Sequence, residues 1–159
     1  MDSQILIGLL LTVLPIFELR GGLPVVMEYV VRNGLSIWPY FILVLVLNIL
    51  VILLIFMFFD FLHELLMKLE FYRKVVGRIL ERVQGKVDKV QERMNRWGYL
   101  ALMFFVAIPL PGTGAWTGTL IAWVLGLDRW KSFVAIATGV IIAGFLILLL
   151  SLGLFNGFH

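Results

Sequence analysis

Two uninterrupted apolar stretches limit what this chain can fold into more than any other feature. Residues 37–59 and residues 133–155 each run for 23 residues without a charged side chain. As α-helices they would reach about 34 Å, while the hydrocarbon core of a bilayer is about 30 Å thick. Because 62% of the chain is hydrophobic and 14% is charged, it has too few charges for the surface of a soluble domain. The sequence predicts an all-α integral membrane protein in which both stretches are transmembrane helices.

Two further apolar segments are interrupted. Residues 4–35 are interrupted at 18–22 by Glu-Leu-Arg-Gly-Gly, and residues 98–127 are interrupted at 109–114 by Pro-Leu-Pro-Gly-Thr-Gly. None of the four apolar pieces is long enough to cross a bilayer alone. Proline removes a backbone donor and glycine permits non-helical dihedral angles, so the chain should turn or unwind at both places. Each segment is therefore either a re-entrant hairpin or a single unwound span.

The distribution of lysine and arginine favours the hairpins. Residues 60–97 hold nine of the 13 basic residues. If both interrupted segments are hairpins, Arg129 and Lys131 join these nine on one side of the membrane, and Arg32 lies on the other. The positive-inside rule then places residues 60–97 in the cytoplasm and both termini outside. We predict a multi-pass protein of the cell (plasma) membrane in this orientation.

The hairpin interpretation also predicts two inverted repeats. Residues 1–59 hold a re-entrant hairpin (4–35) and a transmembrane helix, and residues 98–159 hold a second hairpin (98–127) and a second transmembrane helix. An odd number of crossings before the second half would invert it, as in many transporters. Paired interrupted segments in such repeats point to a binding site near the midplane of the membrane.

The segment that joins the repeats, residues 60–97, is predicted to be a basic amphipathic helix. Its apolar residues recur at spacings of three or four: Leu69, Tyr72, Val76, Ile79, Val83, Val87, Val90, Met94 and Trp97. Such a helix lies on the anionic inner leaflet or packs against a partner subunit or the membrane domain. No base-reading motif accompanies the charge, so no nucleic-acid partner is expected. Because few helices are available to shield two broken backbones from lipid, we expect a homodimer or a higher homo-oligomer.

The residues of the first interruption are candidates for binding an anionic substrate. A charge inside an apolar segment is costly and usually faces a cavity or a partner. Arg20 offers a planar fork of donors suited to phosphate, and Glu18 would neutralise it in the empty site or carry a proton. Gly21 and Gly22 would let backbone N–H groups approach the anion, with a helix beginning at Pro24. The alternative is a shallow turn in the headgroup zone with both charges hydrated or paired.

The second interruption is expected to supply the other half of the site. Pro109 and Pro111 should end the entering helix, and the next helix should start there with free N–H groups. The other candidates at this turn are glycines that free the backbone conformation, threonines with hydroxyl groups and a tryptophan that forms an apolar wall: Gly112, Thr113, Gly114, Trp116 and Thr117. Asn48 in the first transmembrane stretch either contacts substrate or joins two helices. A tight turn without a ligand is the alternative.

The sequence does not point to an enzyme. It has two histidines, His63 and His159, and no cysteine, so neither a thiolate metal site nor a disulfide framework can form. No nucleophile–base arrangement and no phosphate-binding loop motif is present. We therefore predict no catalytic residue, no metal ligand and no cofactor.

Both interruptions resemble a known family. Residues 17–24, Phe-Glu-Leu-Arg-Gly-Gly-Leu-Pro, and residues 108–116, Ile-Pro-Leu-Pro-Gly-Thr-Gly-Ala-Trp, resemble the two signature segments of the small multidrug export proteins. That family is distantly similar to the DedA superfamily of re-entrant-hairpin membrane proteins, which implies opposed hairpins that meet at the membrane centre. DedA relatives are implicated in moving phospholipids or polyprenyl phosphates between leaflets with acidic and arginine residues, which Glu18 and Arg20 match. The arginine-containing second motif of DedA is replaced here by residues 109–114.

Three functions follow from these patterns. The first is a transporter or flippase for an amphipathic anion, with a lipid phosphate as the best-fitting substrate and membrane lipids as partners. The second is a proton-coupled exporter of cationic amphiphilic drugs that uses Glu18, although the neighbouring Arg20 would repel a cation and favour the charged form of Glu18. The third is a membrane scaffold that transports nothing.

Overall fold

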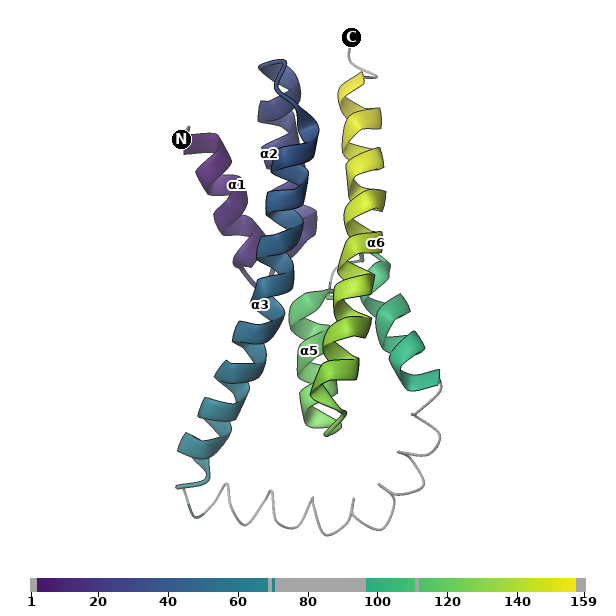
Figure 1. Cartoon of the computed structure of the whole chain (residues 1–159). Coiled ribbons are helices and arrows are strands. Elements are labelled where there is room, and N and C mark those ends of the chain that lie inside the picture. The colour runs from purple at the N-terminus through teal and green to yellow at the C-terminus, as the bar shows by residue number, and fades with distance from the viewer. Residues whose placement is uncertain (1–2, 69, 71–96, 111, 157–159) are drawn as a thin grey trace.

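In the computed structural model, residues 3–68, 70, 97–110 and 112–156 are described, and the regular structure in these ranges is entirely helical (Figure 1). The helices, in chain order, are α1 (Ser3–Val13), α2 (Glu18–Arg32), α3 (Ile37–Leu66), Trp97–Ala107, α5 (Ala115–Val124) and α6 (Arg129–Asn156). This confirms the prediction of an all-α chain. Most of the predicted amphipathic helix, residues 71–96, lies outside the described residues.

By length and composition, α3 and α6 are the two described helices that could cross a membrane. They contain the two predicted transmembrane stretches but are longer, with 30 and 28 residues. α3 continues past residue 59 to Leu66, and α6 begins at Arg129 instead of residue 133. The end of an apolar run does not end a helix, because charged residues such as Glu64 and Lys131 are also good helix formers.

The shorter helices form two pairs that open in opposite directions. Figure 1 shows α1 and α2 meeting at a turn beside the middle of α3, and the Trp97–Ala107 helix and α5 meeting at a second turn at about the same height. The first pair opens toward the end of the molecule where α6 ends, and the second opens toward the end where α6 begins. The two turns are therefore brought together at the middle of the molecule.

The first turn lies earlier in the chain than predicted. Pro15 has no N–H to continue the hydrogen-bond ladder of α1, so the chain turns over residues 14–17. Residues 18–22 belong to α2, in which the N–H of Gly21 donates to the carbonyl of Phe17 (2.9 Å). Pro24 lies inside α2 and does not begin it. The predictions of a helix start at Pro24 and of free N–H groups at Gly21 and Gly22 are wrong.

Gly22 instead allows α1 to pack closely on α2. A Cβ atom at Gly22 would lie 2.0 Å from Oγ1 of Thr12 and 2.4 Å from the carbonyl oxygen of Gly8. Small residues at such crossings let helix backbones approach one another. Gly22 of the first motif thus allows the first helix pair to pack together.

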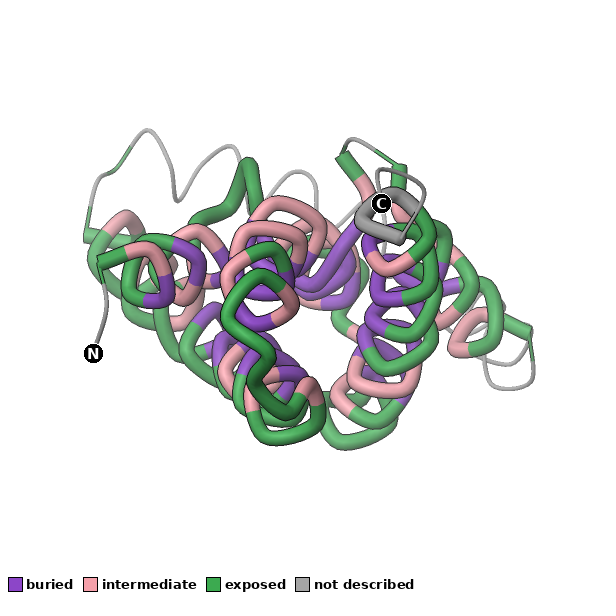
Figure 2. The backbone as a smooth tube through the Cα atoms, turned by 90° about the horizontal axis from the view of Figure 1, so that it is seen from above, coloured by how far each residue is buried: buried purple, intermediate pink, exposed green. Residues whose placement is uncertain are grey.

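The core lies around α2, which packs against α1, α3 and α6. Leu23, Val26 and Met27 of α2 have no exposed surface. In Figure 2 the buried residues of each helix face the middle of the molecule and the exposed residues face outward. Many exposed residues are large and apolar; Met57 of α3 is 68% exposed and Leu149 of α6 is 67% exposed. An apolar exterior of this kind suits contact with lipid better than contact with water.

Candidate functional site

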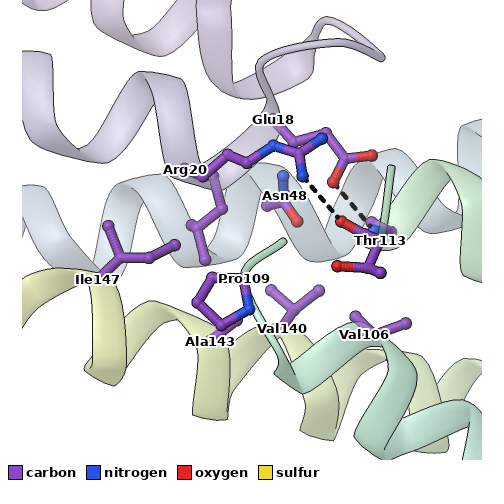
Figure 3. Close-up of a pocket in the computed structure, with 12 residues that line it drawn as sticks. Glu18, Arg20, Asn48, Val106, Pro109, Thr113, Val140, Ala143 and Ile147 are labelled. Carbon is purple, nitrogen blue, oxygen red and sulfur yellow. Dashed lines mark hydrogen bonds between the residues drawn. The ribbon is translucent and has the colours of Figure 1, made fainter. Parts of the chain in front are cut away.

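The two turns meet at a small cavity between α2, α3, α5 and α6 (Figure 3). Its volume is about 20 Å³, roughly the space that one water molecule needs. The lining residues come from both turns and from the two long helices: Glu18, Leu19, Arg20, Asn48, Val106, Pro109, Thr113, Gly114, Ala115, Val140, Ala143 and Ile147. The cavity is therefore too small in this conformation to hold more than a water-sized group.

The carboxylate of Glu18 caps the first turn of α5. Glu18 is 4% exposed, and its oxygens accept the N–H groups of Ala115 (3.2 Å) and Trp116 (3.0 Å). These N–H groups have no partner within α5, and the helix dipole favours a negative charge at this end. Hydrogen bonds to a charged acceptor are among the stronger ones, so Glu18 firmly joins the start of α2 to the start of α5.

The backbone at both ends of this contact adopts unusual conformations. Glu18 has φ = 47°, the one positive value at a non-glycine residue among the described part of the chain, which costs roughly 1–2 kcal/mol. Gly114 has φ = 156°, and a Cβ atom there would lie 1.7 Å from Oε2 of Glu18. Only glycine lets the carboxylate come so close to the α5 backbone. Strain of this kind is often found at functional sites.

Arg20 reaches across to the second turn and contacts carbonyl oxygens there. Its guanidinium group donates to the carbonyls of Leu110, Thr113 (3.3 Å) and, in its own turn, Ile16 (3.2 Å). Among the described residues, the one ion pair within 4.0 Å joins Arg129 and Asp60. Arg20 and Glu18 are therefore not joined by an ion pair within 4.0 Å, and the carboxylate bonds to the α5 N-terminus.

A larger groove lies on the other side of Arg20. Its volume is about 560 Å³, and Arg20 is the charged residue in its lining. The other lining residues are largely apolar and come mainly from the first turn: Pro15, Ile16, Phe17, Gly21 and Gly112. Ile16 is 75% exposed. The guanidinium group therefore lies between the small cavity and the larger, mostly apolar groove.

The second turn keeps its shape through Thr113. The Thr113 hydroxyl lies 2.6 Å from the carbonyl of Ile108 and accepts the N–H of Leu110 (3.2 Å). Pro109 lines the cavity, and Gly112 has φ = 88°, where glycine is favoured. Pro111, also predicted at the site, lies outside the described residues.

Of the remaining predicted site residues, some lie at the site and others do not. Asn48 lines the cavity and donates to the carbonyl of Thr12 (3.0 Å), so it both joins two helices and faces the site. Trp116 contacts Glu18 through its backbone, while its indole donates to the carbonyl of Val13 (3.0 Å). Thr117 and Gly22 line neither the cavity nor the groove.

Sequence reasoning missed the apolar half of the cavity lining. Leu19, Val106, Val140, Ala143 and Ile147 surround the charged residues, and nothing in their local sequence marks them as site residues. Their positions follow from packing between helices far apart in the chain. The donor role of Ala115 could have been found, since this residue directly follows the predicted glycine turn.

Comparison with known proteins identifies the family of this chain. The model of the family described as "Putative small multi-drug export protein" matches residues 18–146, which are 129 of the 159 residues of the chain, and the match includes both turn motifs from Glu18 onward. Searches of curated proteins and of solved structures returned no match. The matched length, the two apolar helices long enough to cross a membrane and the paired turn motifs together show that the chain is a membrane protein that belongs to the small multi-drug export protein family.

Proposed function

We propose that this protein transports an amphipathic anion, with a lipid phosphate as the best-fitting substrate, and binds its charged group where the two turns meet. The family description is that of an export protein, which corresponds to a membrane transporter. The proposal adds the charge of the substrate and the place where it binds.

The environment of Arg20 is the observation that carries this proposal. Its guanidinium group is bonded to neutral carbonyl oxygens of Ile16, Leu110 and Thr113. A phosphate accepts two parallel hydrogen bonds from a guanidinium group, and such charge-assisted bonds are stronger than bonds to carbonyls. When an anion reaches Arg20, the guanidinium group therefore exchanges weaker hydrogen-bond partners for a stronger one.

The shape of the surroundings supports an amphipathic substrate. The groove of about 560 Å³ beside Arg20 offers apolar walls to an acyl or prenyl chain. The N–H groups of Ala115 and Trp116, which Glu18 now occupies, would be further donors to a phosphate once the carboxylate is displaced. In this arrangement Glu18 takes the place that the substrate anion would have at α5.

The arrangement of the helix pairs in the membrane is part of the proposed function. The two helix pairs with opposite openings (Figure 1) would be re-entrant hairpins of two inverted repeats, with their turns near the bilayer midplane. Both termini would face outward, and residues 60–97 would be cytoplasmic. Residues 14–17 of the first turn and Ile108, Leu110 and Gly112 of the second are exposed in the single chain, so a partner subunit or a water-filled cavity would have to keep their backbone away from lipid.

Cysteine labelling tests the topology cleanly, because the chain has no native cysteine. We expect Ser3→Cys and Leu35→Cys to react with a membrane-impermeant reagent from outside intact cells. Lys68→Cys and Leu125→Cys should react after permeabilisation. If Ser3→Cys and Leu35→Cys reacted from opposite sides, the first segment would be a single span and the hairpin assignment would be lost.

Export of a cationic drug is a second candidate function. The family description names multi-drug export, and Glu18 places a buried carboxylate in the cavity. In this alternative Glu18 would release a proton when it binds the cation. The guanidinium group of Arg20 lines the same cavity and opposes the entry of a cation, which is why we favour the anion.

The experiment that separates the two candidates measures flux by the wild-type protein in proteoliposomes. We expect a fluorescent lipid phosphate to exchange between leaflets faster than in protein-free liposomes, with little dependence on an imposed pH gradient. A cationic amphiphilic dye should not move faster. Gradient-driven movement of the dye without movement of the lipid phosphate would establish the cation exporter instead.

A further inference from the structure

A second groove lies on the opposite side of the Trp97–Ala107 helix from α5, beside the first half of α6. Its volume is about 380 Å³. Leu100 and Met103 form one wall, and Val134 and Ala135 form the other. The hydroxyl of Thr138 also lines it but is bonded to the carbonyl of Val134 (2.7 Å), so this part of the groove is effectively apolar too.

One end of this groove carries the side chains that membrane proteins place at the headgroup level. Tyr99, Trp130 and Lys131 line it there, and Trp130 is 70% exposed and stacks on Phe133 with ring centroids 5.6 Å apart. Tryptophan, tyrosine and lysine are enriched at the interface between the hydrocarbon core and the headgroups. In the proposed topology this end of the groove would lie at the interface and the rest of it in the hydrocarbon region.

The charged side chains next to Lys131 in the sequence are bonded to other groups. The guanidinium group of Arg129, two residues earlier, is paired with Asp60 of α3 (2.7 Å). The carboxylate of Asp128 accepts the backbone N–H of Lys131 (2.8 Å) and so caps α6. Among the described residues, no carboxylate lies within 4.0 Å of the Lys131 ammonium group.

We propose that this groove binds an anionic phospholipid from the leaflet at the end of the molecule where α6 begins. One acyl chain lies between the Trp97–Ala107 helix and α6, and the phosphate contacts Lys131. Basic pockets between helices at the membrane interface suit anionic headgroups. The groove contains none of the residues that line the cavity at the turns, so this inference is independent of the proposed transport function.

The test measures lipid binding to the purified full-length protein in detergent. Dioleoyl phosphatidylglycerol should raise the thermal unfolding midpoint saturably, and dioleoyl phosphatidylcholine should raise it less. Lys131→Gln should weaken the apparent affinity for phosphatidylglycerol about fivefold, the usual effect of one basic residue near anionic lipid. Val134→Trp should also weaken it, because Val134 is 48% exposed and the larger ring would fill the groove.

Two controls make the result specific. Lys68→Gln removes an exposed charge just after α3 that does not line the groove, and it should bind phosphatidylglycerol like the wild type. In an Arg20→Ala background, Lys131→Gln should still weaken the response to phosphatidylglycerol, which separates this groove from the site at the turns. Equal losses in Lys68→Gln and Lys131→Gln, or equal responses to the two lipids, would overturn the proposal. So would a lipid effect that Val134→Trp leaves unchanged, or a groove shown by native mass measurements of the variants to be filled by a second copy of the chain.

Discussion

Gly114→Ala is expected to break the contact between the two turns and to abolish most transport. The new Cβ atom would lie 1.7 Å from Oε2 and 2.7 Å from Cδ of Glu18, far inside van der Waals contact. The carboxylate would have to leave the N–H groups of Ala115 and Trp116, and α5 would lose its cap. Overpacking costs about 1–3 kcal/mol, and each lost bond to the charged carboxylate costs about 1.5–3 kcal/mol. The two lost bonds alone correspond to a loss of about 3–6 kcal/mol.

The matched control for this variant is Gly112→Ala in the same turn. Gly112 has φ = 88° but nothing lies within 4 Å of the position of its Cβ atom, so the substitution adds backbone strain of about 1–2 kcal/mol and no clash. Thermal unfolding in detergent and flux in proteoliposomes should therefore fall far more in Gly114→Ala than in Gly112→Ala. Similar values for the two variants would mean that the close approach of Glu18 to Gly114 is unimportant.

Glu18→Ala is expected to have the second largest effect. It leaves the N–H groups of Ala115 and Trp116 without their acceptor in a buried place, and each such unpaired group costs about 1–3 kcal/mol. Glu18→Gln keeps one acceptor oxygen in place and should lose less stability. Glu28→Gln is the control, since Glu28 lies on the same helix and is exposed, and it should change little.

Flux through the Glu18 variants separates structure from proton coupling. In the proposed anion transporter, Glu18→Gln removes a charge that competes with the substrate for the α5 N-terminus. Its flux relative to the amount of folded protein should therefore be at least that of the wild type. A folded Glu18→Gln protein without any flux would contradict this role and would favour a proton step at Glu18.

Most of the fold is predictable from the sequence because bilayer thickness and helix geometry allow few solutions. The long apolar runs of α3 and α6 and the glycine- and proline-rich turn before α5 follow from chain-local rules. The position of the first turn does not, because Glu-Leu-Arg-Gly-Gly is compatible both with a turn and with a helix. The packing of α1 on α2 determines that this segment is helical. With a glycine at position 22 in the helix, α1 can occupy the space that a Cβ atom would need.

The partners of the charged residues could not be predicted for a similar reason. Glu18 and Arg20 are two residues apart, and the sequence predicts only that the carboxylate neutralises the guanidinium group or carries a proton. Apart from the carbonyl of Ile16, the observed partners are 90 to 98 residues away in the chain: Leu110, Thr113, Ala115 and Trp116. The N-terminus of a helix can take the place of a guanidinium group as the partner of a carboxylate. Glu18 has this partner only because the second turn brings the start of α5 close to it.

The central claim is that Arg20 holds the anionic group of the substrate, and leaflet-to-leaflet movement of a labelled lipid phosphate tests it directly. We expect Arg20→Ala to reduce this movement about 30-fold or more, the usual effect of removing one partner of a buried charge pair. Arg20→Lys keeps the charge but not the planar fork, so its flux should lie between those of Arg20→Ala and the wild type. Thermal unfolding of each variant must accompany the flux measurement, since Arg20 also joins the two turns. An Arg20→Ala protein that is folded and moves the lipid phosphate at the wild-type rate would contradict the anion site.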